Sequence, residues 1–418
     1  MTSRLILSGA GLVLPDRLIA SASLVIEGTR IVDISDGPRP RDGASGVQHL
    51  DLTGHLIVPG FIDVHVHGVE GHDGLAAADG VAEMARRLPK YGVTGFCPTT
   101  IACTPEELAA LLGAVRAAQA TPDPRGSRVL AAHLESNFIN PDYRGAQPIE
   151  CIRRPPNAPA DPAIHEQGFT GADVMHVIEA YRREVGIVTM AVEMPGGLDF
   201  ARALVAAGHR VSLGHSGSTF EQAMAGVAAG ARHATHLFNR MSPFGHREPG
   251  LAGAVLSAEE LAAELICDGH HVHQATARLA IAAKRPERVM AITDGTAGSG
   301  MPVGSRVTIG ARPITVTPAA AYLDDGTLAG SVLTMDKAFR MLVNTWGFTV
   351  VEAAVMCATT AARELKLDGR GALAAGAVAD LAVLDQHLEV AQTYVDGTLA
   401  YSRLEAPNLG FSGANTVR

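Results

Sequence analysis

The segment PGFIDVHVH, residues 59–67, decides how the rest of the chain is interpreted. Its central run, residues 61–66, consists mostly of apolar and β-branched residues, which is typical of a strand. Successive side chains of a strand alternate between its two sides, so His65 and His67 point the same way and can reach one ion from a rigid backbone. The segment therefore predicts a strand that ends in two candidate metal ligands.

From Pro59 onward, apolar or β-branched runs alternate with Ala-rich helical stretches, which is typical of repeated βα units around a parallel sheet. Thr104 and Thr219 are placed to cap two of the helices. The strand candidates are residues 61–66, 93–99, 129–135, 187–193, 210–215, 231–236, 263–268 and 289–294. Because eight is the strand number of a closed barrel, we expect an α/β fold with a (β/α)₈ TIM barrel over residues 58–371.

Both ends of the chain have a different, all-β character. Residues 1–57 form short strand-like runs broken by Gly, Pro and Asp, and residues 372–401 alternate strands with Asp-Gly and similar turns. We expect residues 1–57 and 372–418 to form one small, discontinuous β-sandwich domain. Between the last barrel strand and this tail, the sequence predicts a hairpin-like insert at 308–318 and helices at 335–346 and 349–365.

Composition excludes several classes of protein. A chain of 418 residues that is 47% apolar is folded rather than disordered. Its net charge of -9, without a long basic run, argues against a nucleic-acid partner. The five scattered cysteines form no Cys-x-x-Cys pair, and no apolar stretch is long enough to span a membrane. We therefore expect a soluble, cytoplasmic protein without a nucleic-acid or membrane partner.

The predicted strands end in metal-ligand types with unusual frequency. Five of them end in His, Glu or Asp, and their side chains are His65, His67, Glu135, His215, His236 and Asp294. Core packing does not explain this pattern, because buried ionisable groups without partners are costly. We therefore predict a divalent metal site at the carboxyl ends of the strands. By strand parity or isolation we expect structural roles for His133, His233, His246 and His273, while His72 and His270 stay open.

The His-x-His pair after Pro-Gly-Phe-Ile-Asp resembles the amidohydrolase superfamily. A series of further motifs, taken in order, closely resembles the N-acetylglucosamine-6-phosphate deacetylase family. These are HLESNFINPDYRGA (133–146), GHSGST (214–219), ATHLFNRMSPFGHREPGLAGA (234–254), ICDGHHV (266–272), ITDGT (292–296) and LAGSVLTMDKAFRMLV (328–343). The resemblance extends from the N-terminal strands to ADLAVLD at 379–385.

The resemblance implies that Glu135, His215 and His236 hold the catalytic metal and that Asp294 is the general base. Members with His-x-His can hold a second ion, which would add His65 and His67 with Glu135 bridging and Asp294 nearby. Zinc is the expected ion, although iron, manganese or cobalt would accept the same ligands. The resemblance also implies a homodimer. For the sugar phosphate, the resemblance implies contacts from Asn239, from His271 and, from a second subunit, from Arg247.

Ligand chemistry suggests the reaction. A divalent cation lowers the pKa of water to about 7 and polarises an amide carbonyl. Asp294 can then accept the proton of the attacking water and deliver it to the departing amine. Together with this chemistry, the resemblance implies metal-dependent hydrolysis of the N-acetyl amide of an amino-sugar phosphate, giving glucosamine 6-phosphate and acetate from N-acetylglucosamine 6-phosphate.

Two positions depart from the family pattern. Ser136-Asn137 replaces Gly-Pro, and Gln147 replaces a histidine that helps to polarise the substrate carbonyl. Glutamine donates a neutral hydrogen bond but carries no ionisable proton. We still expect Gln147 in the substrate site, with a related acylamino sugar or another amide as alternative substrates. The other hypotheses are a deacetylase of unphosphorylated compounds, a cyclic-amide hydrolase and an inactive scaffold. An inactive scaffold would be expected to have lost metal ligands, and all six are present here.

Overall fold

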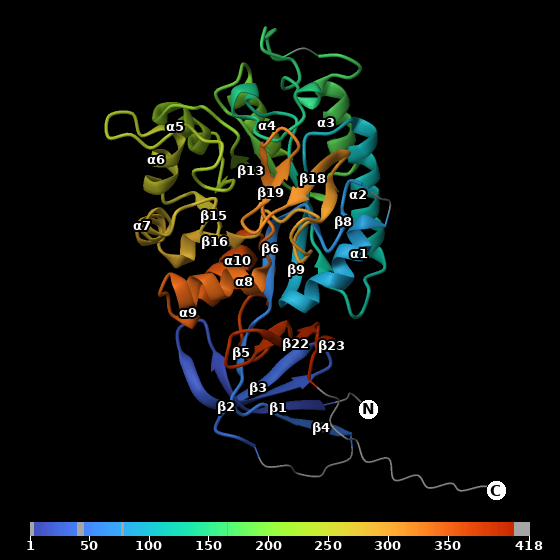
Figure 1. Ribbon diagram of the computed structural model, residues 1–418, viewed down its shortest axis with the longest axis vertical. Coiled ribbons are helices and arrows are strands. Elements are labelled where there is room, and N and C mark those ends of the chain that lie inside the picture. Colours follow the sequence, from blue (N-terminus) through green and yellow to red (C-terminus); the bar gives the residue numbers. More distant parts are fainter. Residues whose placement is uncertain (1–3, 40–45, 77–78, 165, 405–418) are drawn as a thin grey trace, which may run out of the picture.

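The computed structural model describes residues 4–39, 46–76, 79–164 and 166–404. Figure 1 shows a helix-wrapped barrel above a separate sheet that is built from both ends of the chain. The ends of the predicted terminal domain, residues 1–3 and 405–418, lie outside the described residues, and the exact domain limits stay a prediction. Where the two ends of the chain meet, Ile57 pairs with Val383 across an antiparallel ladder.

Eight parallel strands form the barrel, as the sequence predicts. The barrel closes where Val66 bridges Gly295 in parallel, and there the backbone N–H of Asp294 donates to the carbonyl of His65 at 2.9 Å. A short strand, β10 (Arg128–Val129), extends the pairing of β9. In chain order the barrel strands are β6 (Phe61–Val66), β9 (Val93–Thr100), β11 (Ala132–Glu135), β12 (Val185–Met190), β13 (Arg210–Leu213), β14 (His233–Ala234), β15 (Ala262–Ile266) and β16 (Val289–Ile292).

Helices cover the outside of the barrel (Figure 1). Thr104 and Thr219 begin α2 and α5 with reciprocal capping boxes, which confirms the caps expected from the sequence. The α-helices are α1 (Gly80–Arg87), α2 (Pro105–Ala120), α3 (Gly171–Ala180), α4 (Gly197–Ala206), α5 (Phe220–Ala228), α6 (Gly250–Ser257), α7 (Gln274–Lys284), α8 (Met335–Arg340), α9 (Val350–Ala354) and α10 (Thr360–Glu364). Short 3₁₀ turns are η1 (Leu88–Tyr91), η2 (Pro141–Tyr143), η3 (Ile149–Cys151) and η4 (Pro286–Arg288).

The two helices predicted after the barrel each contain a widened turn. Residues of η5 (Met341–Thr345) and η6 (Val355–Thr359) form π-helical turns that follow α8 and α9. Such turns carry one extra residue and occur mostly as single interruptions of an α-helix. Within the described ranges, no helix is both long enough and apolar enough to cross a bilayer.

The terminal sheet combines strands from both ends of the chain. Its hydrogen-bonded order is β23-β22-β21-β5-β1-β2-β3, with β4 added on β1, and it packs around a core of its own that includes Leu7, Leu24 and Leu381. All eight strands are hydrogen-bonded into one mixed sheet, where the sequence predicted a β-sandwich. Their bounds are β1 (Arg4–Val13), β2 (Leu18–Glu27), β3 (Arg30–Asp36), β4 (Val47–Asp51), β5 (Leu56–Pro59), β21 (Leu381–Leu384), β22 (Val390–Val395) and β23 (Thr398–Ser402).

An antiparallel insert follows the last barrel strand. The predicted hairpin is β17 (Arg306–Ile309) and β18 (Arg312–Val316), and the chain then adds β19 (Ala321–Leu323) and β20 (Leu328–Gly330). Its apolar residues pack against Ile101, which follows barrel strand β9. A small hairpin, β7 (Gly68–Val69) with β8 (His72–Asp73), follows β6. In Figure 1 the insert lies at the end of the barrel opposite the terminal sheet.

Candidate active site and metal centre

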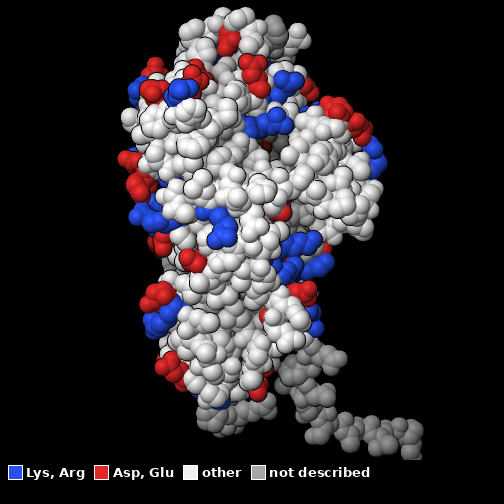
Figure 2. Space-filling model, turned by 60° about the vertical axis from the view of Figure 1, so that its left-hand side comes forward, with Lys and Arg blue, Asp and Glu red and all other residues white. Residues whose placement is uncertain are grey.

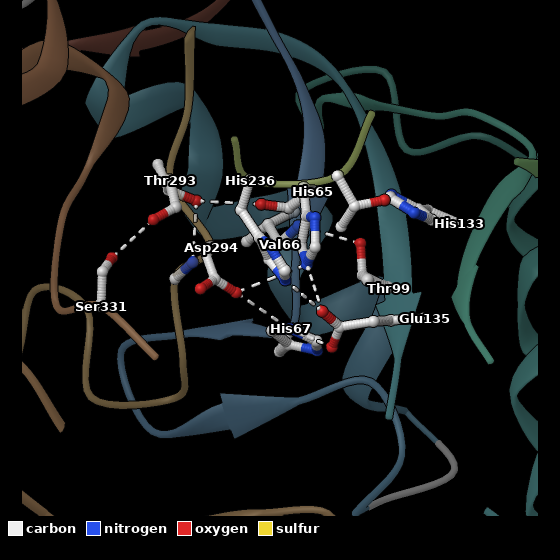
Figure 3. Close-up of polar contacts among 12 residues, drawn as sticks. His65, Val66, His67, Thr99, His133, Glu135, His236, Thr293, Asp294 and Ser331 are labelled. Carbon is white, nitrogen blue, oxygen red and sulfur yellow. Dashed lines mark hydrogen bonds and ion pairs between the residues drawn. The ribbon is translucent and has the colours of Figure 1, made fainter. Parts of the chain in front are cut away.

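The structure brings the six predicted ligand side chains together at the carboxyl ends of the barrel strands. Figure 3 shows five of them pointing toward one another: His65 from β6, His67 directly after β6, Glu135 from β11, His236 after β14 and Asp294 after β16. His215, which follows β13, joins them through Glu135. All six are buried, and Asp294 is the most accessible at 8%.

One oxygen of Glu135 is the meeting point of two imidazoles. Its Oε1 atom lies 2.9 Å from Nε2 of His215 and 2.8 Å from Nε2 of His236. The two nitrogens lie 3.1 Å apart. Nδ1 of His215 donates to the carbonyl of Tyr143 at 2.9 Å, which leaves Nε2 to face Glu135.

The His-x-His pair faces the same carboxylate from the other side. Nε2 of His65 lies 3.7 Å from Oε1 of Glu135 and 3.4 Å from Oδ1 of Asp294. Nε2 of His67 lies 3.7 Å from Oε2 of Glu135 and 3.2 Å from Oδ1 of Asp294. Oε1 of Glu135 thus faces His65 as well as His215 and His236, and Oε2 faces His67, so the carboxylate lies between the two pairs of imidazoles.

Three of the six residues have an unusual backbone conformation. The φ angles of His215, His236 and Asp294 are 42°, 30° and 48°, in the left-handed region that non-glycine residues rarely adopt. Each residue lies two positions after the end of a parallel strand, in the turn at the mouth of the barrel. Such strain is found mostly at functional sites.

The charges of the cluster are mutually stabilised. Burial opposes ionisation of Glu135, but His215 and His236 outweigh it and hold the pKa of Glu135 well below its usual range. Burial also opposes ionisation of Asp294, but the hydrogen bond from His67 helps to outweigh it, and the pKa of Asp294 is lowered. Burial lowers the pKa of His65 to about 3, whereas Asp294 and Glu135 overcome burial at His67 and raise its pKa to about 9.

The donor set fits a divalent metal ion. Two overlapping groups, His65-His67-Glu135 and Glu135-His215-His236, each bring three ligand atoms within 4.8 Å of one another. Nε2 of His65 is buried and has no hydrogen-bond partner among the described residues. Buried imidazole nitrogens around a shared carboxylate oxygen are the coordination set of Zn²⁺ and of other borderline cations.

A polar layer below the cluster contains residues that the sequence interpretation missed or set aside. Glu264, in the middle of β15, was missed, yet its Oε2 lies 2.9 Å from Nδ1 of His65. His133 has Nδ1 at 3.0 Å from the Val64 carbonyl and Nε2 at 2.7 Å from Oγ1 of Thr189. Strand alternation places Glu264 inside the barrel, but the search for ligands concentrated on strand ends. His133 was set aside on strand parity, although it lies two residues before Glu135 and therefore on the same side of β11.

A pocket opens directly above the cluster. Its walls include Asn239 and His271, which the resemblance implied, together with Arg240, which it did not, and with Ile309 and Gly330 of the insert. His271 is held through Nδ1 by Oδ2 of Asp268 at 2.6 Å, and its buried Nε2 has no partner among the described residues.

Arg247, which the resemblance implied, and Arg240, which it did not, lie in different places. Arg247 is exposed and is not among the residues that line this pocket. Arg240 lies on the pocket wall, against Gly145. A Cβ atom at Gly145 would lie 2.6 Å from Nε of Arg240, so only glycine leaves this space free.

Gln147 lines the pocket but uses its amide within the protein. Its Nε2 donates to Oε2 of Glu135, and its Oε1 accepts the backbone N–H of Ala102 at 2.7 Å. Ser136 and Asn137, the other two residues that depart from the family pattern, donate hydrogen bonds to the main chain. Ser136 donates to the carbonyl of Thr189 at 2.6 Å, and Nδ2 of Asn137 donates to the carbonyls of Cys103 and Cys151, both at 2.7 Å.

The other histidines considered in the sequence analysis lie outside the ligand cluster. His273 caps α7, accepting from the N–H of Ala275, and exposed His270 contacts the hydroxyl of Tyr322 at 3.0 Å. His72 lies in β8, His246 is exposed, and His233 lies 3.8 Å from Glu364.

The face drawn in Figure 2 carries basic and acidic patches interspersed with broad uncharged areas.

Comparison with known proteins agrees with this geometry. The model of the amidohydrolase family matches residues 56–400. N-acetylglucosamine-6-phosphate deacetylase of Lysinibacillus sphaericus is 34% identical over 363 residues, covering 85% of this chain and 88% of the relative. The Rattus norvegicus protein of the same name is 36% identical over 374 residues, covering 86% and 87%.

Further relatives extend the match. N-acetylgalactosamine-6-phosphate deacetylase of Escherichia coli O157:H7 is 34% identical over 347 residues, covering 82% of this chain and 88% of the relative. A solved mutant of Mycobacterium smegmatis N-acetyl-D-glucosamine-6-phosphate deacetylase, in complex with N-acetyl-D-glucosamine-6-phosphate, superposes with a TM-score of 0.84. It is 30% identical, covering 96% of this chain and 100% of that chain. The chain therefore belongs to the amidohydrolase family and, within it, to the family of N-acetylglucosamine-6-phosphate deacetylases.

Proposed function

We propose that this protein hydrolyses the N-acetyl amide of an amino-sugar phosphate, with N-acetylglucosamine 6-phosphate as the first substrate to test. The observation that carries the proposal is the convergence of His215 and His236 on one oxygen of Glu135, with Asp294 beside it, at the base of a pocket. The names of the relatives at 34 to 36% identity point to the same reaction class.

The six side chains divide into two roles. Glu135, His215 and His236 would hold the catalytic metal, and His65 and His67 would complete a second position that shares Glu135. We propose zinc, as one or two ions. When bound, such a cation supplies an acidified water and polarises the substrate carbonyl.

Asp294 is the proposed catalytic acid and base. Its carboxylate lines the pocket, and its lowered pKa keeps it ionised at neutral pH. It can accept a proton from the attacking water and then deliver that proton to the sugar nitrogen as the carbon–nitrogen bond breaks. The products are the free amino sugar and acetate, which balances the hydrolysis of one amide by one water.

The sugar end of the pocket has residues suited to a polar, anionic substrate. Asn239 and His271 offer side-chain nitrogen atoms, and Arg240 adds a cation from the same chain. We also propose a homodimer in which Arg247, exposed on the loop between β14 and α6, completes the pocket of the partner. A guanidinium binds phosphate through paired, charge-assisted hydrogen bonds.

A second candidate is supported by Gln147. Its amide donates to Glu135 rather than standing free over the pocket, so carbonyl polarisation by this side chain would differ from that by a histidine. We therefore also consider a related acylamino sugar or another amide, including the galactosamine epimer that the Escherichia coli relative is named for.

Metal analysis of the purified protein, followed by assay of free amine release, tests the proposal. The panel contains N-acetylglucosamine and N-acetylgalactosamine, each with and without a 6-phosphate, and an unphosphorylated cyclic amide. Preferential turnover of a phosphorylated N-acetyl sugar supports the proposal. A protein that binds metal but releases amine from none of the N-acetyl compounds contradicts it.

A further inference from the structure

Glu264 is a buried carboxylate that no step of the proposed reaction uses. It lies in β15 with 0% exposure, and its Oε2 atom is 2.9 Å from Nδ1 of His65 and 3.4 Å from the backbone nitrogen of His236. Its other oxygen, Oε1, has no hydrogen-bond partner within the described part of the chain. Burying a carboxylate with an unfilled acceptor is costly, so packing alone does not account for this residue.

The contact with Glu264 determines which nitrogen of His65 is free. When Glu264 is ionised it only accepts hydrogen bonds, and the ring proton of His65 then lies on Nδ1. Nε2 then keeps its lone pair, and this is the atom that faces Glu135 at 3.7 Å and Asp294 at 3.4 Å. A partner on the far nitrogen of a metal-binding histidine fixes its tautomer and its orientation.

The other clustered histidines are supported differently. Nδ1 of His215 donates to the Tyr143 carbonyl at 2.9 Å. Nδ1 of His67 and Nδ1 of His236 have no partner among the described residues. Within that part of the structure, His65 is thus the one clustered histidine with a carboxylate behind it, although Glu264 also approaches the backbone of His236.

We propose that Glu264 is a positioning residue that holds His65 with Nε2 directed at Glu135 and Asp294. The metal position formed by His65, His67 and Glu135 then depends on a residue that would touch neither metal nor substrate. This inference rests on the proposed metal-dependent function and adds the group that prepares one of its ligands. Because Oε2 also approaches the N–H of His236, the same carboxylate connects the two metal positions.

Direct metal titration tests the role of Glu264. Metal-free wild-type protein and variants are titrated with Zn²⁺ against a chromophoric chelator. We expect Glu264→Leu to weaken zinc binding at one position by about 10- to 100-fold, the usual effect of removing such a partner. Glu264→Gln keeps a carbonyl oxygen for the Nδ1–H of His65, so we expect affinity close to wild type. Glu184→Gln, a mostly buried carboxylate paired with Arg116, is the matched control and should change nothing.

A double-mutant cycle separates positioning from general destabilisation. If Glu264 acts through His65, adding Glu264→Leu to His65→Ala causes no further loss of zinc affinity. Additive losses, a wild-type affinity in Glu264→Leu, or an equal loss in Glu264→Gln would each overturn the inference. Circular dichroism checks folding, and Glu264→Ser, whose hydroxyl is too short to reach His65, replaces the leucine variant if that one does not fold. Wild-type protein that binds no zinc would instead contradict the proposed function.

Discussion

Asp294 and His67 face each other across the seam that closes the barrel, with Oδ1 of Asp294 3.2 Å from Nε2 of His67. The main chains of the two segments are also joined, because the N–H of Asp294 donates to the carbonyl of His65 and the N–H of His67 donates to the carbonyl of Gly295, both at 2.9 Å. The proposed acid and base is therefore held by the backbone of the His-x-His pair.

Because backbone hydrogen bonds hold Asp294 in place, changing its side chain should affect proton transfer more than metal binding. We expect Asp294→Asn to keep most of its metal, because the amide preserves the shape of the side chain, while kcat falls by about 10²–10⁴ because the amide cannot accept a proton. Since the pKa of Asp294 lies below its usual value, wild-type activity should lose this base only below about pH 4. Metal content and a pH–rate profile measure both effects, and near-normal turnover in the variant would mean that another group is the base.

His215 and His236 are expected to be indispensable for the metal. Both face one oxygen of Glu135 within 2.9 Å, and a catalytic site with three protein ligands has none to spare. His215→Ala and His236→Ala should therefore lose bound metal together with nearly all activity. His273→Ala, at the cap of α7, is the matched histidine control. Full metal content in either site variant would refute the ligand assignment.

Arg247 is expected to recognise phosphate from across a subunit boundary. Arg247→Ala should raise KM much more for a phosphorylated sugar than for the same sugar without phosphate, because it removes a charge-assisted contact. If the contact crosses the boundary, dilution that separates the dimer should also lower specific activity.

Arg240 provides the comparison for Arg247. It lines the pocket of its own chain, so the effect of Arg240→Ala should not depend on protein concentration. An equal effect of Arg247→Ala on both forms of the sugar would contradict its phosphate role.

Gln147 is expected to act on Glu135 as well as on the substrate. Its Nε2 donates to Oε2 of Glu135, so Gln147→Ala should weaken metal binding by about 10- to 100-fold, as the loss of other outer partners does. If the amide also polarises the substrate carbonyl in the complex, kcat at saturating metal should fall by a further factor of about 10²–10³. Zinc titration and kinetics at high zinc measure the two effects separately.

Gln147→His tests the identity of the substrate. A family-like site should gain activity toward N-acetylglucosamine 6-phosphate once an imidazole is restored, whereas a site adapted to another amide should not. If both Gln147 substitutions leave metal affinity and every kinetic constant unchanged, the side chain has no part in the site.

Glu364, which does not line the pocket, is expected to make stability depend on pH in the acid range. Burial opposes its ionisation, but His233 and Arg363 lower its pKa to about 2, and Arg210 and Arg288 lie 3.3 Å away. Its stabilising effect is present above the unfolded-state pKa near 4.3 and is lost as pH falls toward 2. Glu364→Gln should lower stability at pH 7 by about 1–2 kcal/mol, because its partly exposed arginine partners remain solvated. Urea unfolding should show that difference shrinking below pH 4. A constant difference would contradict the linkage.

The sequence predicted the barrel and the ligand cluster because both depend on local patterns. Buried parallel strands form continuous apolar runs, and their carboxyl ends converge wherever a barrel closes. The strand around His236 was predicted over residues 231–236 but covers only His233–Ala234. The reason lies in the left-handed turn at His236, which ends the ladder and which no apolar pattern indicates.

The residues that the sequence interpretation missed act over long distances. Glu264 is a single carboxylate within the apolar run AAELI, and only the fold brings it to His65, 199 residues away. Arg240 became a pocket residue because Gly145, on a different loop, leaves space for it. The direction of the Gln147 amide likewise depends on the N–H of Ala102. Contacts of this kind are set by the tertiary structure rather than by neighbouring residues.

The left-handed backbone at His215, His236 and Asp294 has a consequence for attempts to engineer this protein. Each such conformation costs roughly 1–3 kcal/mol, and glycine would adopt it with little strain. Replacing His215 or His236 by glycine would relieve that strain, but it would also leave the buried charge of Glu135 with one partner fewer, and this loss is larger than the strain. A laboratory selection for heat resistance would therefore retain the two histidines, because the contacts that build the site also offset the strain of its backbone.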